Sequence, residues 1–312
     1  MPNLRRNAAA ASVSIGASNR VPMCAKLAEK IGLERIVAAM RTVTALTHFP
    51  PGLLPLIASF LGVDFIVVAG GLDILGNVLA STVCYSLDSK TWRTVVPKMT
   101  SVRSAATVAI DGRMMVFGGS DANGSVLATC EAFDPVTSEW KALPPMSTPR
   151  MCASAVAWEG RAFVIGGWNG LTVLSSVECF DPTLNRWSAI APLTTARYLA
   201  AAVAVHGRGL LVMGGYSNRH VNRDPPILQS AELYDPATKK WTAMRWQLRK
   251  PLSHFVVHCI DGVLYLVGGY TSDGPTNSEF WSMDLKAAMP VWSLFASLPI
   301  ALQWLSIPSV VV

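Results

Sequence analysis

A Gly-Gly pair that recurs five times at nearly constant spacing is the feature that most constrains how this 312-residue chain can fold. The first glycines of successive pairs are 48, 48, 48 and 54 residues apart. The pairs are Gly70-Gly71, Gly118-Gly119, Gly166-Gly167, Gly214-Gly215 and Gly268-Gly269. A tryptophan follows each pair in step, at Trp92, Trp140, Trp187, Trp241 and Trp292. Self-similarity with a period close to 50 residues indicates an array of repeated structural units.

Each repeat is typical of four short β-strands. In Arg161–Trp187, one apolar strand ends in Gly-Gly, a second ends in Phe-Asp-Pro, and a third begins at Trp187. Another apolar run precedes each Gly-Gly strand and is joined to it by a turn signal such as Asp111-Gly112 or Asp261-Gly262. Asp-Gly between hydrophobic runs favours a tight hairpin, because both residues can take positive φ. Four strands per unit predict an all-β propeller.

Aspartates mark the ends of the third strands in the middle repeats. They occur as Asp134-Pro135, Asp181-Pro182 and Asp235-Pro236. Aspartate can accept hydrogen bonds from nearby backbone N–H groups, and proline presets the turn dihedral. We therefore expect tight turns between the third and fourth strands.

The end of the chain supplies a strand that the first repeat lacks. In three repeats the inner strand is preceded by an arginine ten or eleven residues after a tryptophan, and Gln303 lies eleven residues after Trp292. Residues 304–312 therefore stand where another inner strand belongs. We expect a propeller of five four-stranded blades, with residues 304–312 as the innermost strand of blade one. A competing closure places Leu56–Leu61 in that position.

This pattern resembles the kelch repeat. An apolar strand with Gly-Gly, a strand ending in aromatic-Asp, and a following tryptophan recur over Asp64–Leu298. Members of the kelch family are β-propellers that bind other proteins, and some of them are enzymes. Six blades are common in the family, so five blades are a departure, and an incomplete ring is the alternative to a closed one.

The first 50 residues differ from the repeats in charge. They carry seven Lys or Arg residues against two acids, whereas the net charge of the whole chain is +6, so the repeats are nearly neutral and give no nucleic-acid signal. Residues 1–22 have the composition of a disordered tail, with a mitochondrial-type targeting segment as the alternative. Apolar residues at helical spacing over Met23–Val43 predict a helix.

The stretch that joins this extension to the repeats has three interpretations. Phe49–Gly62, with residues 51–62 as its ambiguous part, resembles the opening of an F-box, a helical module that joins adaptors to a ubiquitin ligase scaffold. The remainder of an F-box is missing, because the first kelch strand starts near Asp64. An inner strand is the second interpretation. A membrane span over Leu53–Val68 is the third, although Pro55 and Asp64 interrupt a run that is already short for a bilayer.

The six cysteines favour a reducing compartment. No two of them form a CxxC pair, which leaves a zinc knuckle without support. Cys84 and Cys130 occupy equivalent positions in neighbouring repeats, as small core residues would. The chain opens without a secretory signal, so we expect a cytoplasmic protein.

Three arginines are candidate partner-binding residues. Arg103, Arg150 and Arg197 each follow a Ser/Thr-rich link and precede an inner strand, so rotation around the ring would bring them to one mouth of the channel. In related kelch adaptors, arginines at this repeat position bind acidic peptides, and a guanidinium pairs with a carboxylate in a planar two-bond geometry. An inter-blade salt bridge or backbone contact is the structural alternative.

Residues that follow the Gly-Gly pairs face a mouth in related kelch domains. Here Trp168, Tyr216 and Tyr270 would supply large, rigid contact area of the kind enriched in binding hot spots. The further candidates on this surface are Ser120, Asn169, Asn218 and Asp273. Asn218 also begins an insertion that lengthens the fourth period.

An enzyme is the weaker alternative. Asp121, Glu159 and Asp273 are the loop carboxylates that could serve an acid/base reaction on a sugar, and the sequence suggests no cofactor. His254 and His258 lie four apart on a predicted strand, which separates them by about 13 Å, too far for one metal. We therefore expect a module that binds an acidic or mixed peptide segment of another protein. Its specific version is a ubiquitin-ligase substrate receptor, and an actin-binding scaffold is a further alternative.

Overall fold

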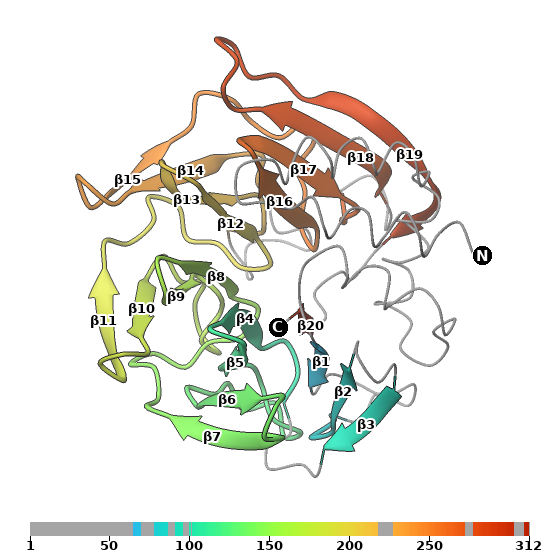
Figure 1. The fold of residues 1–312 in the computed structure, drawn as a ribbon. Coiled ribbons are helices and arrows are strands. Elements are labelled where there is room, and N and C mark those ends of the chain that lie inside the picture. Colours follow the sequence, from blue (N-terminus) through green and yellow to red (C-terminus); the bar gives the residue numbers. More distant parts are fainter. Residues whose placement is uncertain are drawn as a thin grey trace.

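The computed structural model describes residues 65–69, 78–86, 91–95, 100, 102–217, 227–271, 277–302 and 309–311. This part of the chain contains five four-stranded antiparallel sheets and no helix. Figure 1 shows the sheets as successive blades of a propeller, which confirms the predicted fold. The predicted helix over Met23–Val43 and the ambiguous residues 51–62 lie outside the described residues.

Each blade runs from an inner to an outer strand. Blade one contains β20 (Ser309–Val311), β1 (Phe65–Ala69), β2 (Thr82–Ser86) and β3 (Thr91–Val95). Blade two contains β4 (Ala106–Ile110), β5 (Arg113–Phe117), β6 (Cys130–Asp134) and β7 (Glu139–Leu143). Blade three contains β8 (Ser154–Trp158), β9 (Arg161–Ile165), β10 (Val177–Asp181) and β11 (Arg186–Ile190). Blade four contains β12 (Ala201–Val205), β13 (Gly209–Met213), β14 (Ala231–Asp235) and β15 (Lys240–Ala243). Blade five contains β16 (Val256–Ile260), β17 (Val263–Val267), β18 (Asn277–Asp284) and β19 (Ser293–Leu302).

The last strand of the chain completes the first blade. β20 pairs antiparallel with β1, with Val67 opposite Val310 and Ile66 opposite Val311. The prediction that the C-terminal residues supply this inner strand is confirmed. The place that Leu56–Leu61 would have taken in the competing closure is therefore occupied.

Turn chemistry explains why the strands fold back so sharply. Asp111 and Gly112 have φ angles of 49° and 72°, and Asp261 and Gly262 have 49° and 80°, which is the conformation that Asp-Gly favours. At the same end of the blades, the Asp181 carboxylate accepts hydrogen bonds from backbone N–H groups of the two residues that follow Pro182. Those bonds and the neighbouring Arg161 hold the pKa of Asp181 below its ordinary value.

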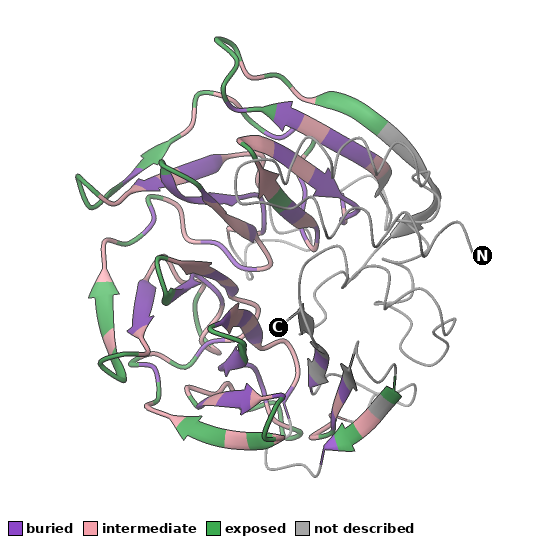
Figure 2. Cartoon of the chain, in the orientation of Figure 1, coloured by how far each residue is buried: buried purple, intermediate pink, exposed green. Residues whose placement is uncertain are grey.

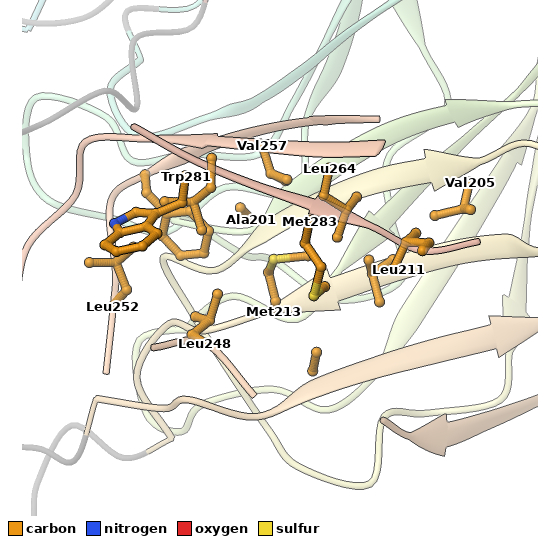
Figure 3. Close-up of a cluster of buried hydrophobic side chains, with 14 residues drawn as sticks. Ala201, Val205, Leu211, Met213, Leu248, Leu252, Val257, Leu264, Trp281 and Met283 are labelled. Atoms are coloured by element: carbon orange, nitrogen blue, oxygen red, sulfur yellow. The ribbon is translucent and has the colours of Figure 1, made fainter. Parts of the chain in front are cut away.

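Hydrophobic clusters fill the spaces between consecutive blades. Four clusters of buried side chains join blade one to two, two to three, three to four, and four to five. Figure 2 shows the same pattern as buried middle strands and largely exposed outer strands. Figure 3 shows the cluster between blades four and five, in which Met213 and Leu211 meet Leu264, Met283 and Trp281.

The repeated tryptophans fasten one blade to the linker that precedes it. The indole N–H of Trp187 donates to the Pro144 carbonyl at 2.7 Å, and that of Trp241 donates to the Ala191 carbonyl at 2.8 Å. The Trp187 ring also packs edge-on against Phe117 of the preceding blade at 5.3 Å. These contacts support a structural role for the tryptophans.

The Gly-Gly pairs permit the chain to pass very close to the linker that enters the next blade. Gly166 has a φ of 64°, and a Cβ atom there would lie 2.3 Å from the Arg197 carbonyl oxygen. Real Cβ atoms do not approach a backbone oxygen so closely, so no other residue fits without moving the linker.

The described cysteines are free and most of them are buried. Cys84 and Cys130 are 0% and 2% exposed, in agreement with small core residues. Burial raises the pKa of the Cys130 thiol to about 12, so this thiol stays protonated and unreactive at neutral pH.

Removing β20 tests the closure. Deletion of residues 309–312 leaves β1 as an exposed edge and removes a three-residue ladder, at about 1 kcal/mol for each lost hydrogen bond. For a domain of this size we expect the melting temperature to fall by roughly 5–10 °C in calorimetry. Deletion of Val312 alone, which follows β20, is the control, and equal melting of both truncations would contradict the closure.

Candidate functional site

Four blades present the same short β-bridge where the chain leaves the Gly-Gly strand. We call the end of the propeller that carries these bridges the loop face. Its bridged pairs are Arg103 with Ser120, Met151 with Trp168, Tyr198 with Tyr216, and Ser253 with Tyr270. The hairpin turns such as Asp111-Gly112 lie at the opposite end of the blades, because each strand reverses direction between the two.

An aromatic row crosses the loop face from blade four to blade five. Tyr198 and Tyr216 stack with ring centroids 5.3 Å apart and planes inclined by 27°. Tyr216 then meets His254 edge-on at 6.2 Å, and His254 meets Tyr270 at 6.4 Å. The Ser253 hydroxyl lies 3.0 Å from Nδ1 of His254. Burial lowers the pKa of His254 to about 4, so the ring is neutral at physiological pH and the row carries no charge there.

Blade three places a different apolar group on the loop face. Asn169 Oδ1 accepts hydrogen bonds from the amides of Leu171 (2.9 Å) and Thr172 (2.7 Å), which closes a tight loop after Trp168. This loop leaves the Leu171 side chain 79% exposed. The Asn169 side-chain oxygen therefore shapes its own loop, and the expected hydrogen bond of Asn169 to a partner stays a prediction. The sequence analysis did not name Leu171 as a candidate contact residue. The signal was present, because leucine directly follows the Asn169-Gly170 turn and so lies at the tip of the loop.

A chain of three backbone hydrogen bonds joins the linkers that enter blades two, three, four and five. Four residues at equivalent positions have positive φ: Ser104 (56°), Cys152 (54°), Leu199 (53°) and His254 (53°). The Cys152 amide donates to the Ser104 carbonyl and the Leu199 amide to the Cys152 carbonyl, both at 2.9 Å. The His254 amide donates to the Leu199 carbonyl at 3.2 Å. These residues line a cavity of about 60 Å³, a volume that corresponds to a few water molecules.

Two of the predicted binding arginines are buried inside the blades. Arg150 is 0% exposed and pairs with Glu178 at 2.6 Å, and it also donates to the carbonyls of Gly166 and Ser176. Burial lowers the pKa of the Arg150 guanidinium, and the charge of Glu178 opposes that shift.

Arg197 repeats this arrangement in blade four. It is 1% exposed, pairs with Glu232 at 2.7 Å, and donates to the carbonyls of Gly214 and Ser230. A guanidinium engaged in this way cannot pair with the carboxylate of a partner. The predicted binding role of Arg150 and Arg197 is therefore wrong. The structural alternative, a salt bridge with backbone contacts, is correct, but the salt bridge joins the incoming linker to its own blade and does not join two blades.

The third arginine occupies a different position in the repeat. The amides of Arg150 and Arg197 donate to Leu127 and Leu174, and in blade two the corresponding bond to Leu79 comes from Val102. Arg103 is one residue further along, at the position of Met151 in the bridges of the loop face. The sequence carried this signal, because Arg103 lies eleven residues after the preceding repeat tryptophan, whereas Arg150 and Arg197 each lie ten residues after theirs.

Arg103 is half-buried on the loop face. Its Nε donates to Ser120 Oγ at 3.2 Å, which uses one of its five donor hydrogens. Ser120 itself is 1% exposed, so it supports Arg103 and cannot present a contact surface, contrary to the prediction.

Blades two and five vary the buried Arg–Glu pair. In blade two, Glu131 holds the Thr100 amide at 3.3 Å, but Val102 stands where the arginine would be. Burial raises the pKa of Glu131, and the Thr100 amide opposes that shift. In blade five, Leu252 and Trp281 occupy the two positions and pack in the same hydrophobic cluster. The position therefore serves blade packing whether its residues are ionic or apolar.

The remaining candidate residues are polar and acidic side chains of the loops. Asn218 and Asp273 lie outside the described residues. Of the carboxylates considered for catalysis, Asp121 lies on the loop face and accepts backbone N–H groups of its own loop, while Glu159 lies in a hairpin turn at the opposite end. These two do not converge, and the described residues contain no cluster of three metal-ligating side chains.

The repeats, the glycine pairs and the five sheets define a β-propeller of the kelch type. The family described as "KLHDC2/KLHL20/DRC7 Kelch-repeats domain" matches residues 57–269, more than half of the chain. The chain therefore belongs to the kelch-repeat family, whose domains typically act in protein interaction. A search of curated proteins gave no significant match. Within the described residues, no helix has the length and apolar character needed to cross a membrane.

The buried pairs should be indispensable for stability. Arg150→Ala leaves the Glu178 carboxylate buried without its counter-charge, so we expect a loss of about 3–5 kcal/mol in urea unfolding. Arg150→Leu combined with Glu178→Leu imitates the apolar solution of blade five and should lose much less. If the Arg150→Ala variant has the same urea midpoint as the wild type, the ion pair does not stabilise the blade.

Glu131 should make stability depend on pH. Its folded-state pKa is raised, so its contribution is fully present below the unfolded pKa and is lost as the pH rises through the folded value. Glutamine is neutral at every pH, so Glu131→Gln should raise the melting temperature at pH 7 and have little effect at pH 4. Glu139→Gln, at an exposed site on β7, is the control in the same calorimetric series. A Glu131→Gln effect of equal size at both pH values would contradict this assignment.

Proposed function

We propose that the loop face binds an extended segment of a partner protein. The observation that carries this proposal is the row of Tyr216, His254 and Tyr270, which runs from blade four to blade five and is neutral at physiological pH; the buried Tyr198 stacks against Tyr216 and supports it. Tyrosine and tryptophan are enriched in binding hot spots because they bring large contact area at a low entropic cost. Loops held by a rigid scaffold are also where binding residues concentrate.

The side chains of the loop face favour a partner segment of mixed character. With Arg150 and Arg197 buried, Arg103 is the arginine of the predicted set that remains on this face. Trp168 and the exposed Leu171 add an apolar contact on blade three. A segment with apolar or aromatic anchors and a single carboxylate directed at Arg103 would match this chemistry better than a strongly acidic peptide.

Affinity purification with mass spectrometry tests the loop face. The variant Trp168→Ala/Tyr270→Ala removes two aromatic anchors from different blades and should lose the partners that the wild type retains. Hot-spot side chains contribute about 2 kcal/mol or more, so the dissociation constant of a purified partner should rise at least about 30-fold. Unchanged melting of the variant shows that it is folded.

The matched control changes apolar side chains at the other end of the propeller. Val136 and Leu184 are 73% and 56% exposed in the turns that follow β6 and β10. Val136→Ser/Leu184→Ser should keep every partner. Loss of partners from this control, together with retention by the aromatic variant, would place the binding surface on the opposite end and overturn the proposal.

The more specific form of the proposal is a substrate receptor of a ubiquitin ligase. It rests on the resemblance of the chain to kelch adaptors and of Phe49–Gly62 to the start of an F-box. Under this form, cullin subunits co-purify with the wild type and also with the Trp168→Ala/Tyr270→Ala variant, because the scaffold and the substrate use different parts of the chain. Purification without any cullin subunit would reject the ligase form and leave the interaction module intact.

A further inference from the structure

The linkers that enter blades three and four bind a carboxylate through two consecutive backbone amides. In blade three, the amides of Ser147 and Thr148 donate to the two carboxylate oxygens of Glu178, at 2.8 and 3.2 Å. Blade four repeats the arrangement at 2.7 and 3.1 Å with the equivalent residues Thr194, Thr195 and Glu232. We call this pair of linker amides the amide cradle. Two examples in one chain show that its geometry suits a carboxylate.

Blade five keeps the linker of the amide cradle but has no glutamate opposite it. Arg249 and Lys250 take the two positions, because Leu248 before them makes the backbone hydrogen bond that Met146 makes in blade three. Trp281 stands in the place of the glutamate, and an indole N–H is a donor that offers no oxygen to an amide. Within the part of the chain that the structure describes, the amides of Arg249 and Lys250 donate to no acceptor.

The side chains at the cradle of blade five are cationic, where the other two cradles have Ser or Thr. The Arg249 guanidinium lies over the Trp281 ring, 4.4 Å from the ring centroid. Stacking holds its plane in one orientation, and among the described residues its N–H groups have no acceptor. Lys250 pairs with Glu279 at 3.2 Å, and their side chains are 47% and 28% exposed. Both cations can therefore be reached from solvent.

The space and the charge beside the cradle suit one carboxylate. Arg249, Lys250, Glu279 and Trp281 are among the residues that line a cavity of about 20 Å³. That volume corresponds to about one water-sized group, such as a carboxylate oxygen. Two cations and one acid leave a net charge of +1, which a singly charged carboxylate neutralises. A phosphate carries close to two negative charges at neutral pH and would also be repelled by Glu279.

We propose that the amide cradle of blade five binds the carboxylate of an aspartate or glutamate side chain on another protein. The carboxylate takes the place that Glu178 takes in blade three, and Arg249 adds a charge-assisted hydrogen bond. The linker runs on to Ser253, which is bridged to Tyr270 on the loop face, so a protein bound there comes within reach of the cradle. The source of the carboxylate thus rests on the proposed function, whereas the cradle itself does not.

NMR titration of the full-length protein tests the cradle without a known partner. The probe is N-acetyl-glutamate N-methylamide, a model of a glutamate side chain, and its glutamine counterpart at the same ionic strength is the neutral control. We expect saturable shifts of the Arg249 and Lys250 amide signals with the glutamate probe and none with the glutamine probe. The amides of Thr194 and Thr195 should not shift, because Glu232 already occupies their cradle.

Two variants of equal charge change separate the cradle from general electrostatic attraction. Arg249→Ser/Lys250→Thr imitates the linker of blade three and should weaken binding of the glutamate probe roughly tenfold or more, because the charge-assisted hydrogen bonds are lost. Lys239→Ser/Lys240→Thr removes two exposed cations at the start of β15 and should keep the wild-type affinity. Unchanged melting of both variants shows that they are folded.

Three results would overturn the proposal. They are the absence of shifts with the glutamate probe, equal affinity of the two variants, and tighter binding of N-acetyl-phosphoserine N-methylamide, which would indicate a phosphate site. None of these measurements involves the aromatic row, so any of them leaves the loop face in place as a binding surface. Conversely, retention of partners by the Trp168→Ala/Tyr270→Ala variant would overturn the loop face and leave the carboxylate site of blade five standing.

Discussion

The fold depends on one contact that is repeated from blade to blade. The second glycine of a pair donates its N–H to a carbonyl of the linker that enters the next blade, as Gly119 does to Arg150 and Gly167 to Arg197, at 2.8 and 2.9 Å. The first glycine of the pair must lack a Cβ, because a Cβ at Gly118 or Gly166 would lie 2.2 or 2.3 Å from the same carbonyl oxygen. Each linker is thus held in place at the point where it enters its own blade. The tryptophan of the next blade then holds the same linker from the outside.

The fixed linkers divide the remaining positions into two kinds. Some positions stabilise the blade and can be occupied by either charged or apolar residues. One such pair of positions holds Arg197 and Glu232 in blade four and Leu252 and Trp281 in blade five. A buried ion pair and a well-packed apolar pair can be of similar stability, so repeats can exchange them. Other positions lie on the loop face, outside the hydrophobic clusters between the blades, and there we propose that a partner binds.

The sequence predicted most of the fold, because the fold is built from local signals that repeat. Gly-Gly and Asp-Gly impose backbone conformations at the residues themselves, and the count from each tryptophan located the closing strand, β20. It predicted the candidate site less well. Trp168, Tyr216 and Tyr270 do lie on the loop face, but Arg150 and Arg197 point into their blades. A shift of one residue between Arg103 and Arg150 separates a surface residue from a buried one, and residue types alone do not reveal it.

The sequence by itself determined the number of blades, their turns and their order, since each follows from short-range backbone preferences and apolar patterning. Only the tertiary structure decided which charges are buried and which side chains meet. Arg150 is buried because Glu178 and two carbonyls converge on it from other strands of the same blade. The aromatic row exists because Tyr216, His254 and Tyr270 come from loops of adjacent blades. Contacts between residues that are distant along the chain depend on how blades pack, and that packing is a property of the whole ring.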